Sequence, residues 1–311
     1  MGEPSTQIQT AKPHQRRSGY VLSPIDGSPL FFERESHLSH TVSSDASAKL
    51  GAVMTDGIGC DGFIWKYLRP DLRTDLDIVH WHYPGHGRSP APHHSLNLQI
   101  ADLADDLVAV MDETKTAKAV LFGHSMGVQV VLETYRRHPK RVAAMVLLCG
   151  MWENPLRTFR GNRSLEVVLP KLRSLVARAP GLFNTASRWL TPTRLAYALA
   201  KRLEINADLL DPNDFMPYLR GLSLIDVPLF LSMLSGAAEH SAEDVLPLVD
   251  IPTLIIGGER DGFTPPELSK QMADAIPNAE LLIIEGGSHT APIERPALVA
   301  HTVKTFLAQR L

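Results

Sequence analysis

Short apolar segments of strand length alternate with amphipathic segments of helical length along most of this 311-residue chain. The helical segments repeat apolar residues at intervals of three and four, as at Leu96, Ile100, Leu103 and Leu107. Because the strand segments are apolar almost throughout, both faces of the sheet that they form must be covered. The alternation therefore predicts an α/β protein with a mostly parallel central sheet flanked by helices. The predicted strands cover residues 52–55, 77–83, 119–122, 142–148, 253–256 and 281–284.

The alternation stops between residues 151 and 247, where helical patterns continue without a convincing strand. The segment directly follows the strand that leads to Cys149, so we predict a helical lid inserted into the sheet domain. The alternative is a peripheral helical bundle with no role at the functional site. We expect helices over residues 165–179, 194–203, 215–222 and 228–238, cut short by prolines at 170, 180, 192, 212, 217 and 228.

The two ends of the chain complete the predicted domain organisation. Residues 1–18 are polar and predict a disordered tail, and residues 20–34 predict a hairpin that turns at Asp26-Gly27. The sheet domain then comprises residues 19–150 and 248–311, and the lid comprises residues 151–247. A chain of this length has room for one large core with an inserted subdomain.

The composition is that of an ordinary globular protein, with 44% hydrophobic and 21% charged residues. The net charge of −3 gives no indication of binding to nucleic acid or to an anionic membrane surface. No apolar run reaches the roughly 20 residues that a membrane-spanning helix needs, and no secretory signal is evident. We therefore expect a cytoplasmic protein that binds a small molecule. Its two cysteines, Cys60 and Cys149, are expected to be free thiols.

The motif Gly123-His124-Ser125-Met126-Gly127 has the form Gly-x-Ser-x-Gly. It follows a buried strand and opens an amphipathic helix, which is the context of a nucleophile elbow. Such a turn requires glycine at both ends and projects the serine hydroxyl above the sheet. The alternative is a serine that only caps the helix between two glycines. We predict that Ser125 is a catalytic nucleophile.

From about Tyr20 onward the chain resembles the α/β-hydrolase superfamily, in the lidded branch of esterases, lactonases, carbon–carbon bond hydrolases and cofactor-free perhydrolases. In this branch the catalytic acid follows a late strand, and the catalytic histidine follows the next one. The resemblance therefore implies Asp261 as the acid and His289 as the base. The chain order serine, aspartate, histidine is the one that this fold uses. Some members place the acid before the lid, where Glu153 is the nearest candidate.

The same resemblance implies an oxyanion hole formed by the main-chain N–H groups of Met126 and Ile58. Ile58 follows Asp56-Gly57, where the family usually has His-Gly, so an aspartate replaces the usual histidine. His82 is a second departure, because the family's Asp-x-x-Gly-x-Gly-x-Ser turn usually begins with aspartate. We expect this turn to be structural.

Two further groups of residues are weaker candidates for the functional site. Five histidines, at positions 80, 82, 86, 93 and 94, lack a fixed ligand spacing and an obvious acidic partner. We therefore predict no metal site and no cofactor. Large aromatic residues of the predicted lid are candidates for the substrate pocket, although most such residues belong to hydrophobic cores. These candidates are Trp152, Phe183, Trp189 and Phe230.

The predicted residues favour hydrolysis of a carboxylic ester, a lactone or a thioester through an acyl-enzyme intermediate. Carbon–carbon bond cleavage and perhydrolysis are alternatives, because the same triad serves them. A ligand-binding receptor of the same fold, which retains the triad, is an alternative from another class. We expect a substrate with an apolar part, while the sequence leaves its identity and the oligomeric state undetermined.

Overall fold

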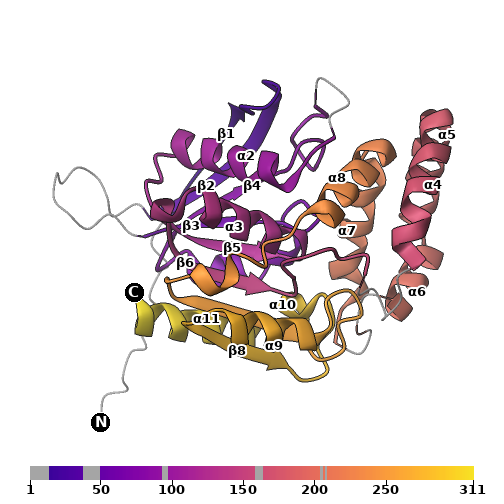
Figure 1. The fold of residues 1–311 in the computed structure, drawn as a ribbon. Coiled ribbons are helices and arrows are strands. Elements are labelled where there is room, and N and C mark those ends of the chain that lie inside the picture. Colours follow the sequence, from indigo (N-terminus) through magenta and orange to yellow (C-terminus); the bar gives the residue numbers. More distant parts are fainter. Residues whose placement is uncertain (1–13, 38–49, 93–96, 158–163, 204–205, 207–208) are drawn as a thin grey trace, which may run out of the picture.

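A computed structural model of the protein describes residues 14–37, 50–92, 97–157, 164–203, 206 and 209–311. Its centre is a sheet of eight strands in the order β1-β2-β4-β3-β5-β6-β7-β8 (Figure 1). β1 pairs antiparallel with β2 and β2 with β4, while all other neighbours are parallel. The structure confirms the predicted fold class. From β1 to β8 the strands are His14–Leu22, Pro29–His37, Gly51–Thr55, Asp77–Trp81, Ala119–His124, Val142–Leu148, Thr253–Gly258 and Ala279–Ile284.

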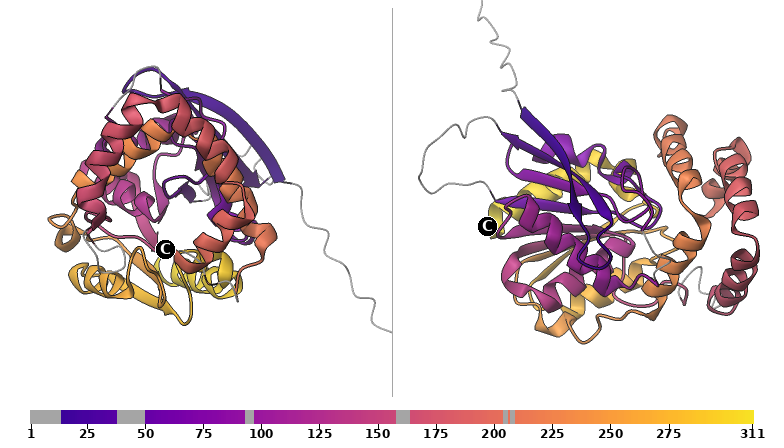
Figure 2. Two further views of the ribbon diagram at one scale, coloured as in Figure 1. Left: turned by 90° about the vertical axis from the view of Figure 1, so that its right-hand side faces the viewer. Right: turned by 90° about the horizontal axis from the view of Figure 1, so that it is seen from above.

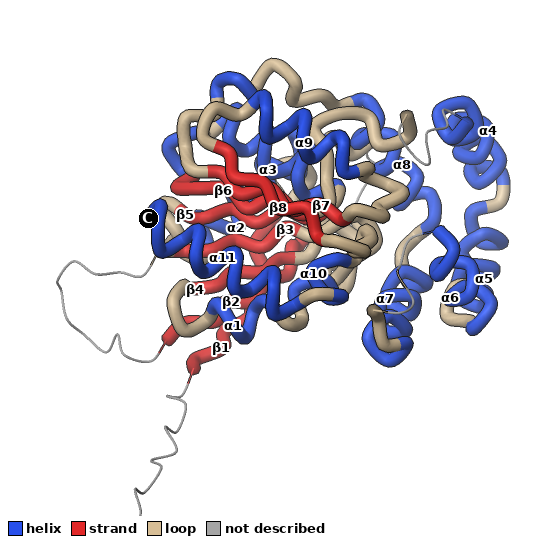
Figure 3. The backbone as a smooth tube through the Cα atoms, turned by 90° about the horizontal axis from the view of Figure 1, so that it is seen from below, coloured by secondary structure: helices blue, strands red, loops and turns tan. Residues whose placement is uncertain are grey.

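The central strands are apolar throughout because alternate side chains of one strand enter two hydrophobic clusters, one on each face of the sheet. In β5, Leu121 belongs to the cluster that contains α2, α3 and α9, whereas Val120 and Phe122 belong to the cluster that contains α1 and α11. Figure 1 and Figure 3 show these helices on opposite faces of the sheet. The helices and short 3-10 turns of this domain are Phe63–Trp65 (η1), Leu68–Leu72 (α1), Ile100–Glu113 (α2), Met126–Arg137 (α3), Pro139–Arg141 (η2), Leu246–Leu248 (η4), Pro266–Ala275 (α9), Ala291–Glu294 (α10) and Pro296–Arg310 (α11).

In the described part of the chain, five α-helices are inserted between β6 and β7, and they lie beyond the carboxyl ends of the parallel strands (Figure 1). α7 and α8 are next to the sheet domain, because Phe215 of α7 and Met233 of α8 belong to its two hydrophobic clusters. α4, α5 and α6 form an outer layer that packs on α7 and α8. The inserted helices are Ser164–Arg178 (α4), Pro180–Leu190 (α5), Arg194–Leu203 (α6), Pro212–Leu224 (α7) and Val227–Glu239 (α8).

No single helix of the described chain has the length and hydropathy of a membrane span. α7 and α8 meet those criteria only when they are taken together, and the chain bends by 102° between them.

The N-terminal boundary predicted from the sequence is wrong by several residues. β1 begins at His14, so residues 14–18 belong to the sheet, while residues 1–13 of the predicted tail lie outside the described residues. This edge strand is polar because most of its side chains are exposed, and Arg16 pairs with Glu33 of β2 at 2.6 Å. A polar segment can therefore be an exposed edge strand as well as a disordered tail, and its composition alone does not distinguish the two.

Two of the prolines do not end a helix. Pro170 and Pro217 lie inside α4 and α7, as they do in the predicted helices over residues 165–179 and 215–222. Each proline removes one main-chain hydrogen bond, but the neighbouring Leu169 and Phe215 are buried and hold the two helices in place. Pro180 stands at the first position of α5, a helix that we did not predict.

Candidate active site

Ser125 lies at the sharp turn between β5 and α3, with backbone angles of φ 54° and ψ −120° that residues other than glycine rarely adopt. The glycines on either side permit close approach of the backbone. A Cβ atom on Gly123 would lie 2.6 Å from the carbonyl oxygen of Gly127, and one on Gly127 would lie 2.4 Å from that of Thr55. The turn therefore has the geometry of a nucleophile elbow.

The structure brings Ser125, His289 and Asp261 into one hydrogen-bonded chain. Ser125 Oγ lies 3.0 Å from His289 Nε2, and His289 Nδ1 lies 2.9 Å from Asp261 Oδ2. Because an ionised carboxylate only accepts hydrogen bonds, Nδ1 donates to Asp261 and Nε2 is left to accept from Ser125. This is the tautomer that a general base next to a serine requires.

Asp261 follows β7 and its side chain is buried. Its Oδ1 accepts from the main-chain N–H groups of Phe263 and Thr264 at 2.8 and 2.9 Å, and its Oδ2 also accepts from the Thr264 hydroxyl at 2.6 Å. These bonds fix the carboxylate in the orientation that meets His289. The alternative acid, Glu153, is instead placed where its main-chain carbonyl accepts from a side chain of α3.

His124, which precedes Ser125, holds the main chain of His289. Its Nε2 lies 3.0 Å from the His289 carbonyl oxygen, and because a carbonyl only accepts, Nε2 carries the proton. Burial, followed by the neighbouring His289, lowers the pKa of His124 to about 4, so the ring is neutral at neutral pH. Our sequence analysis missed this contact, because it joins residues 165 positions apart.

The loop after β3 brings Ile58 next to the elbow. A Cβ atom on Gly57 would lie 3.0 Å from Ser125 Cβ, so the loop approaches the elbow closely at this glycine. Ile58 and Met126 both line one cavity with His289. Within the described chain, no acceptor bonds the main-chain N–H of Ile58 or of Met126.

Asp56, which stands where the family usually has histidine, forms a buried hydrogen bond with a histidine under this loop. Asp56 Oδ2 lies 2.8 Å from Nε2 of His80 on β4, and both side chains are almost completely buried. Burial raises the pKa of Asp56, but His80, together with the more distant His82 and His124, lowers it below its ordinary value. The Asp56 carbonyl also accepts from the Tyr83 hydroxyl at 2.6 Å. The histidine-rich segment therefore has an acidic partner that was not obvious from the sequence, because Asp56 and His80 lie 24 positions apart.

The next histidines of this segment have structural contacts of their own. His86 Nε2 accepts from the main-chain N–H of Gly59 at 3.1 Å, and its Nδ1 donates to a main-chain carbonyl at 3.0 Å. His82 Nδ1 accepts from the main-chain N–H of Arg88 at 2.8 Å. Burial lowers the pKa of both histidines, to about 4 for His82. The segment thus supports the loop that carries Ile58.

No cluster of three or more potential metal-ligating side chains occurs among the residues that the structure describes. His93 and His94 of the histidine-rich segment lie outside those residues. Neither Cys60 nor Cys149 forms a disulfide, as predicted, and both side chains are buried.

A cavity of about 260 Å³ lies between the sheet domain and the inserted helices. His124, Met126 and His289 line it from one side, and Phe230 of α8 is among the residues that line it from the other. No Asp, Glu, Lys or Arg side chain borders it in the described part of the chain. The remaining lining is mostly apolar: Ile58, Cys60, Phe63, Pro155, Leu156, Leu165, Phe215, Tyr218, Leu234, Ala237 and Phe263, with Gly57 and Thr290.

Of the four aromatic residues predicted to line this cavity, only Phe230 does so. Trp152 is buried in the main hydrophobic cluster of the sheet domain. Phe183 packs against a small cluster between α4 and α8. Trp189 is 77% exposed on α5. The sequence shows that these residues are large and apolar, but not which side of a helix faces the cavity.

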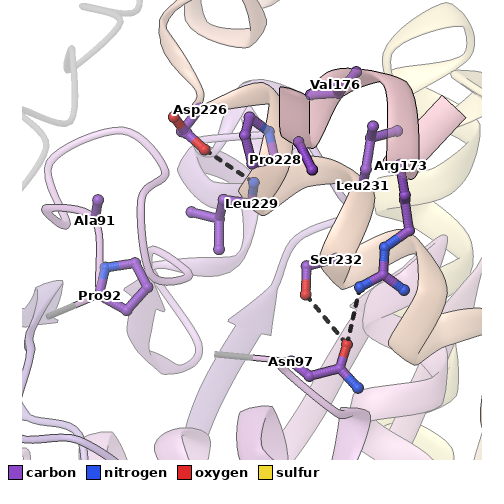
Figure 4. Close-up of a pocket in the computed structure, with 11 residues that line it drawn as sticks. Ala91, Pro92, Asn97, Arg173, Val176, Asp226, Pro228, Leu229, Leu231 and Ser232 are labelled. Atoms are coloured by element: carbon purple, nitrogen blue, oxygen red, sulfur yellow. Dashed lines mark hydrogen bonds between the residues drawn. The ribbon is translucent and has the colours of Figure 1, made fainter. Parts of the chain in front are cut away.

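A second pocket, of about 480 Å³, lies between α4, α8 and the chain near Pro92 (Figure 4). Within it, Arg173 and Ser232 point toward Asn97, whose Oδ1 lies 3.3 and 3.5 Å from their donor atoms. None of Ser125, Asp261 and His289 lines this pocket, so the smaller cavity is the one at the candidate active site.

The fold and the candidate site define a class of α/β proteins in which a serine at a strand–helix elbow meets a histidine and an aspartate after later strands of the same sheet. A family model described as the alpha/beta hydrolase fold matches residues 57–296. The chain therefore belongs to the α/β-hydrolase fold family, as its sequence motifs predicted.

Individual relatives are distant. A protein of Pseudomonas syringae named "Putative carbamate hydrolase RutD" is 27% identical over 82% of this chain and 93% of its own. The enol-lactonase of Burkholderia xenovorans has a TM-score of 0.74 at 23% identity, covering 93% of this chain and 100% of its own. An esterase of Thermogutta terrifontis has a TM-score of 0.69 at 22% identity, covering 95% and 98%. The two solved structures show the likeness of the fold.

Proposed function

We propose that the protein is a serine hydrolase that cleaves a carboxylic ester, or a lactone or thioester, through an acyl-enzyme intermediate. Ser125 is the nucleophile, His289 the general base and Asp261 the acid that orients it. The observation that carries the proposal is the hydrogen-bonded chain of these three side chains at the edge of an apolar cavity. Family membership supports it at the level of a hydrolase fold.

In this mechanism, His289 Nε2 accepts the hydroxyl proton of Ser125 as Oγ attacks the carbonyl carbon of the substrate. Asp261 stabilises the imidazolium ion that forms. The imidazolium returns the proton to the leaving oxygen or sulfur, and the acyl group stays on Ser125. A water molecule, deprotonated by the same imidazole, then attacks the acyl carbon. The bond to Ser125 Oγ breaks, the imidazolium returns the proton to Oγ, and the acid is released.

The negative charge that develops on the substrate oxygen needs hydrogen-bond donors in place before the reaction. The main-chain N–H groups of Ile58 and Met126 are suited to this role, because both residues line the cavity and neither N–H is bonded within the described chain. Asp56, His80 and His86 support the Ile58 loop from below.

We further propose that residues 151–247 act as a lid over the site. Leu156, Phe215 and Phe230 of this segment line the same cavity as Met126 and His289 of the sheet domain. A charged substrate group would lose hydration here without gaining an ion pair, because no charged side chain lines the described part of the cavity. The substrate should therefore carry an uncharged apolar group next to the scissile bond.

Labelling with a fluorophosphonate probe, together with turnover of p-nitrophenyl butyrate, tests the assignment of Ser125. Ser125→Ala should remove both labelling and turnover, because it deletes only the nucleophilic hydroxyl. Ser174→Ala, on the exposed side of α4, is the matched control and should behave as the parent protein. Equal turnover by Ser125→Ala and the parent would refute the assignment. Labelling without turnover of any ester would favour a receptor, or one of the other reactions that the triad serves.

Carbamate hydrolysis is a second candidate, and it rests on the name of the Pseudomonas syringae relative. The attack on the carbonyl carbon is the same, and His289 protonates the same alcohol oxygen as it leaves. Matched esters and carbamates with the same alcohol leaving group separate the two. If kcat/KM is higher for the carbamate than for the ester, the carbamate becomes the proposed substrate, and Ser125 remains the proposed nucleophile.

A further inference from the structure

The outer layer of the inserted helices, α4 to α6, is the part of the described chain that lies farthest from the sheet. Figure 1 shows α4 and α5 at the edge of the molecule, and the left view in Figure 2 shows the three helices from outside. Among the described elements, this layer packs mainly on α7 and α8. Its outer face is therefore available to a partner.

This layer has a charge opposite to that of the rest of the protein. Residues 164–203 contain seven basic residues and one acidic residue, whereas the remainder contains 24 basic and 33 acidic residues. The single acid, Glu166, pairs with Arg157. Five of the bases are exposed, and no ion pair joins them to described residues: Lys171, Arg178, Arg188, Arg194 and Lys201. The net charge of −3 for the whole chain conceals this segregation.

The same three helices also expose large apolar side chains. Trp189 is 77% exposed and Leu195 is 79% exposed, although large apolar residues of these types usually lie in a hydrophobic core. Such a concentration is unusual for a surface that meets only water. The other exposed apolar residues of this layer are Val167, Val168, Leu172, Leu175, Leu182, Leu190 and Leu199.

We propose that the outer face of α4, α5 and α6 binds the surface of an anionic lipid bilayer. Helices that lie in a membrane interface combine basic residues with Trp and Leu, which is the combination found here. The apolar side chains enter the headgroup region, and the bases meet lipid phosphates and carboxylates. A symmetric dimer through this face would bring two strongly basic surfaces together. A nucleic acid would leave the apolar side chains without an apolar partner.

Vesicle co-sedimentation of the full chain tests this proposal. The protein should bind vesicles of phosphatidylcholine mixed with phosphatidylserine, bind pure phosphatidylcholine weakly, and be released by high salt. Arg178→Gln, Arg188→Gln and Arg194→Gln together should lower the partition coefficient roughly 100-fold, because each base near an anionic surface contributes about fivefold. The matched control replaces Lys118, Lys140 and Lys304, which are exposed outside the inserted helices, with glutamine and should bind as the parent does.

A second variant separates the apolar contribution from the charge. Trp189→Ser with Leu195→Ser should weaken binding by about tenfold or more while keeping its salt dependence. Neither variant should alter turnover of a soluble ester, so failure of this proposal is distinct from failure of the proposed function. The proposal would be overturned by no binding to either vesicle, by equal binding to both, or by a dimer in the absence of lipid that the Trp189 variant abolishes. Binding of nucleic acid that is lost in the arginine variant would also overturn it.

Discussion

Two side chains hold His289, one through its ring and one through its main chain. Asp261 accepts from its Nδ1 at 2.9 Å, and His124 donates to its main-chain carbonyl at 3.0 Å. The first contact sets the tautomer of the ring, and the second anchors the loop that carries it. Ser125 therefore meets an imidazole whose position and proton are both fixed before a substrate arrives.

At the residue scale, we expect Asp261→Asn to lower kcat on the order of 10⁴-fold with little loss of stability, by analogy with the serine proteases. The amide keeps the shape of the carboxylate, but it does not stabilise the imidazolium ion and favours the wrong tautomer. Steady-state kinetics with a p-nitrophenyl ester measure the change. Glu153→Gln is the control and should be nearly silent. The reverse pattern would show that Glu153 is the acid.

At the scale of elements, the site depends on close approach of β3, β5 and α3. We expect Gly127→Ala to destabilise the protein by about 1–3 kcal/mol or more and to abolish turnover, because its Cβ atom would lie 2.4 Å from the Thr55 carbonyl oxygen. Urea unfolding measures the first effect and ester turnover the second.

Gly181→Ala provides the matched control for that variant. Nothing lies within 4 Å of the added methyl group, and Gly181 is a helical residue of α5. The substitution should raise the free energy of unfolding by about 0.4–1 kcal/mol, because it restricts the unfolded chain. Equal destabilisation by both substitutions would contradict the steric argument.

The helix α8 gives the site a specificity that can be measured. We expect Phe230→Ala to enlarge the cavity and to shift the preference among p-nitrophenyl esters toward longer acyl chains, seen as a change in relative kcat/KM. Trp189→Ala, on the exposed surface of α5, should leave that preference unchanged. An unchanged preference in the Phe230 variant would place the acyl group elsewhere and argue against the lid proposal.

At the scale of the whole molecule, buried ionisable groups make stability depend on pH in opposite directions. Burial lowers the pKa of His82 and His124 to about 4, so their contribution is present above about pH 6.5 and is lost as the pH falls toward 4. Burial raises the pKa of Asp106 to about 7, so its contribution is present below about pH 4 and is lost as the pH rises through 7. Between about pH 4 and 6.5 the two histidines favour a free energy of unfolding that rises with pH, and the single carboxyl favours one that falls. For these three groups together the free energy of unfolding rises with pH.

We therefore expect Asp106→Asn to steepen the rise of the unfolding free energy between about pH 4 and 6.5, by up to about 1.4 kcal/mol per pH unit. The asparagine oxygen can still accept from Ser23, whose hydroxyl lies 2.5 Å from Asp106. Urea unfolding at several pH values measures the slope. Asp274→Asn, which changes an exposed carboxyl group of α9, should keep the slope of the parent. Identical slopes for all three proteins would show that Asp106 does not hold its proton in the folded state.

The sequence by itself determined the features that depend on local patterns. The apolar periodicity predicted the parallel strands, and the tight glycine turn predicted the geometry around Ser125. The family resemblance, carried by the same motifs, pointed to Asp261 and His289, which the structure brings to Ser125. These predictions succeeded because neighbours in the chain fix the strand, the turn and the order in which the residues reach one edge of the sheet.

Only the tertiary structure decided which distant residues meet. The pairing of Asp56 with His80, the support of His289 by His124, and the choice of Phe230 rather than Trp189 for the cavity each depend on how separate elements pack. The basic and apolar outer face has the same origin, because composition gives the charges but not the side of a helix on which they lie. Periodicity predicts that a helix has an apolar face. Which element packs on that face depends on residues that are distant in the sequence.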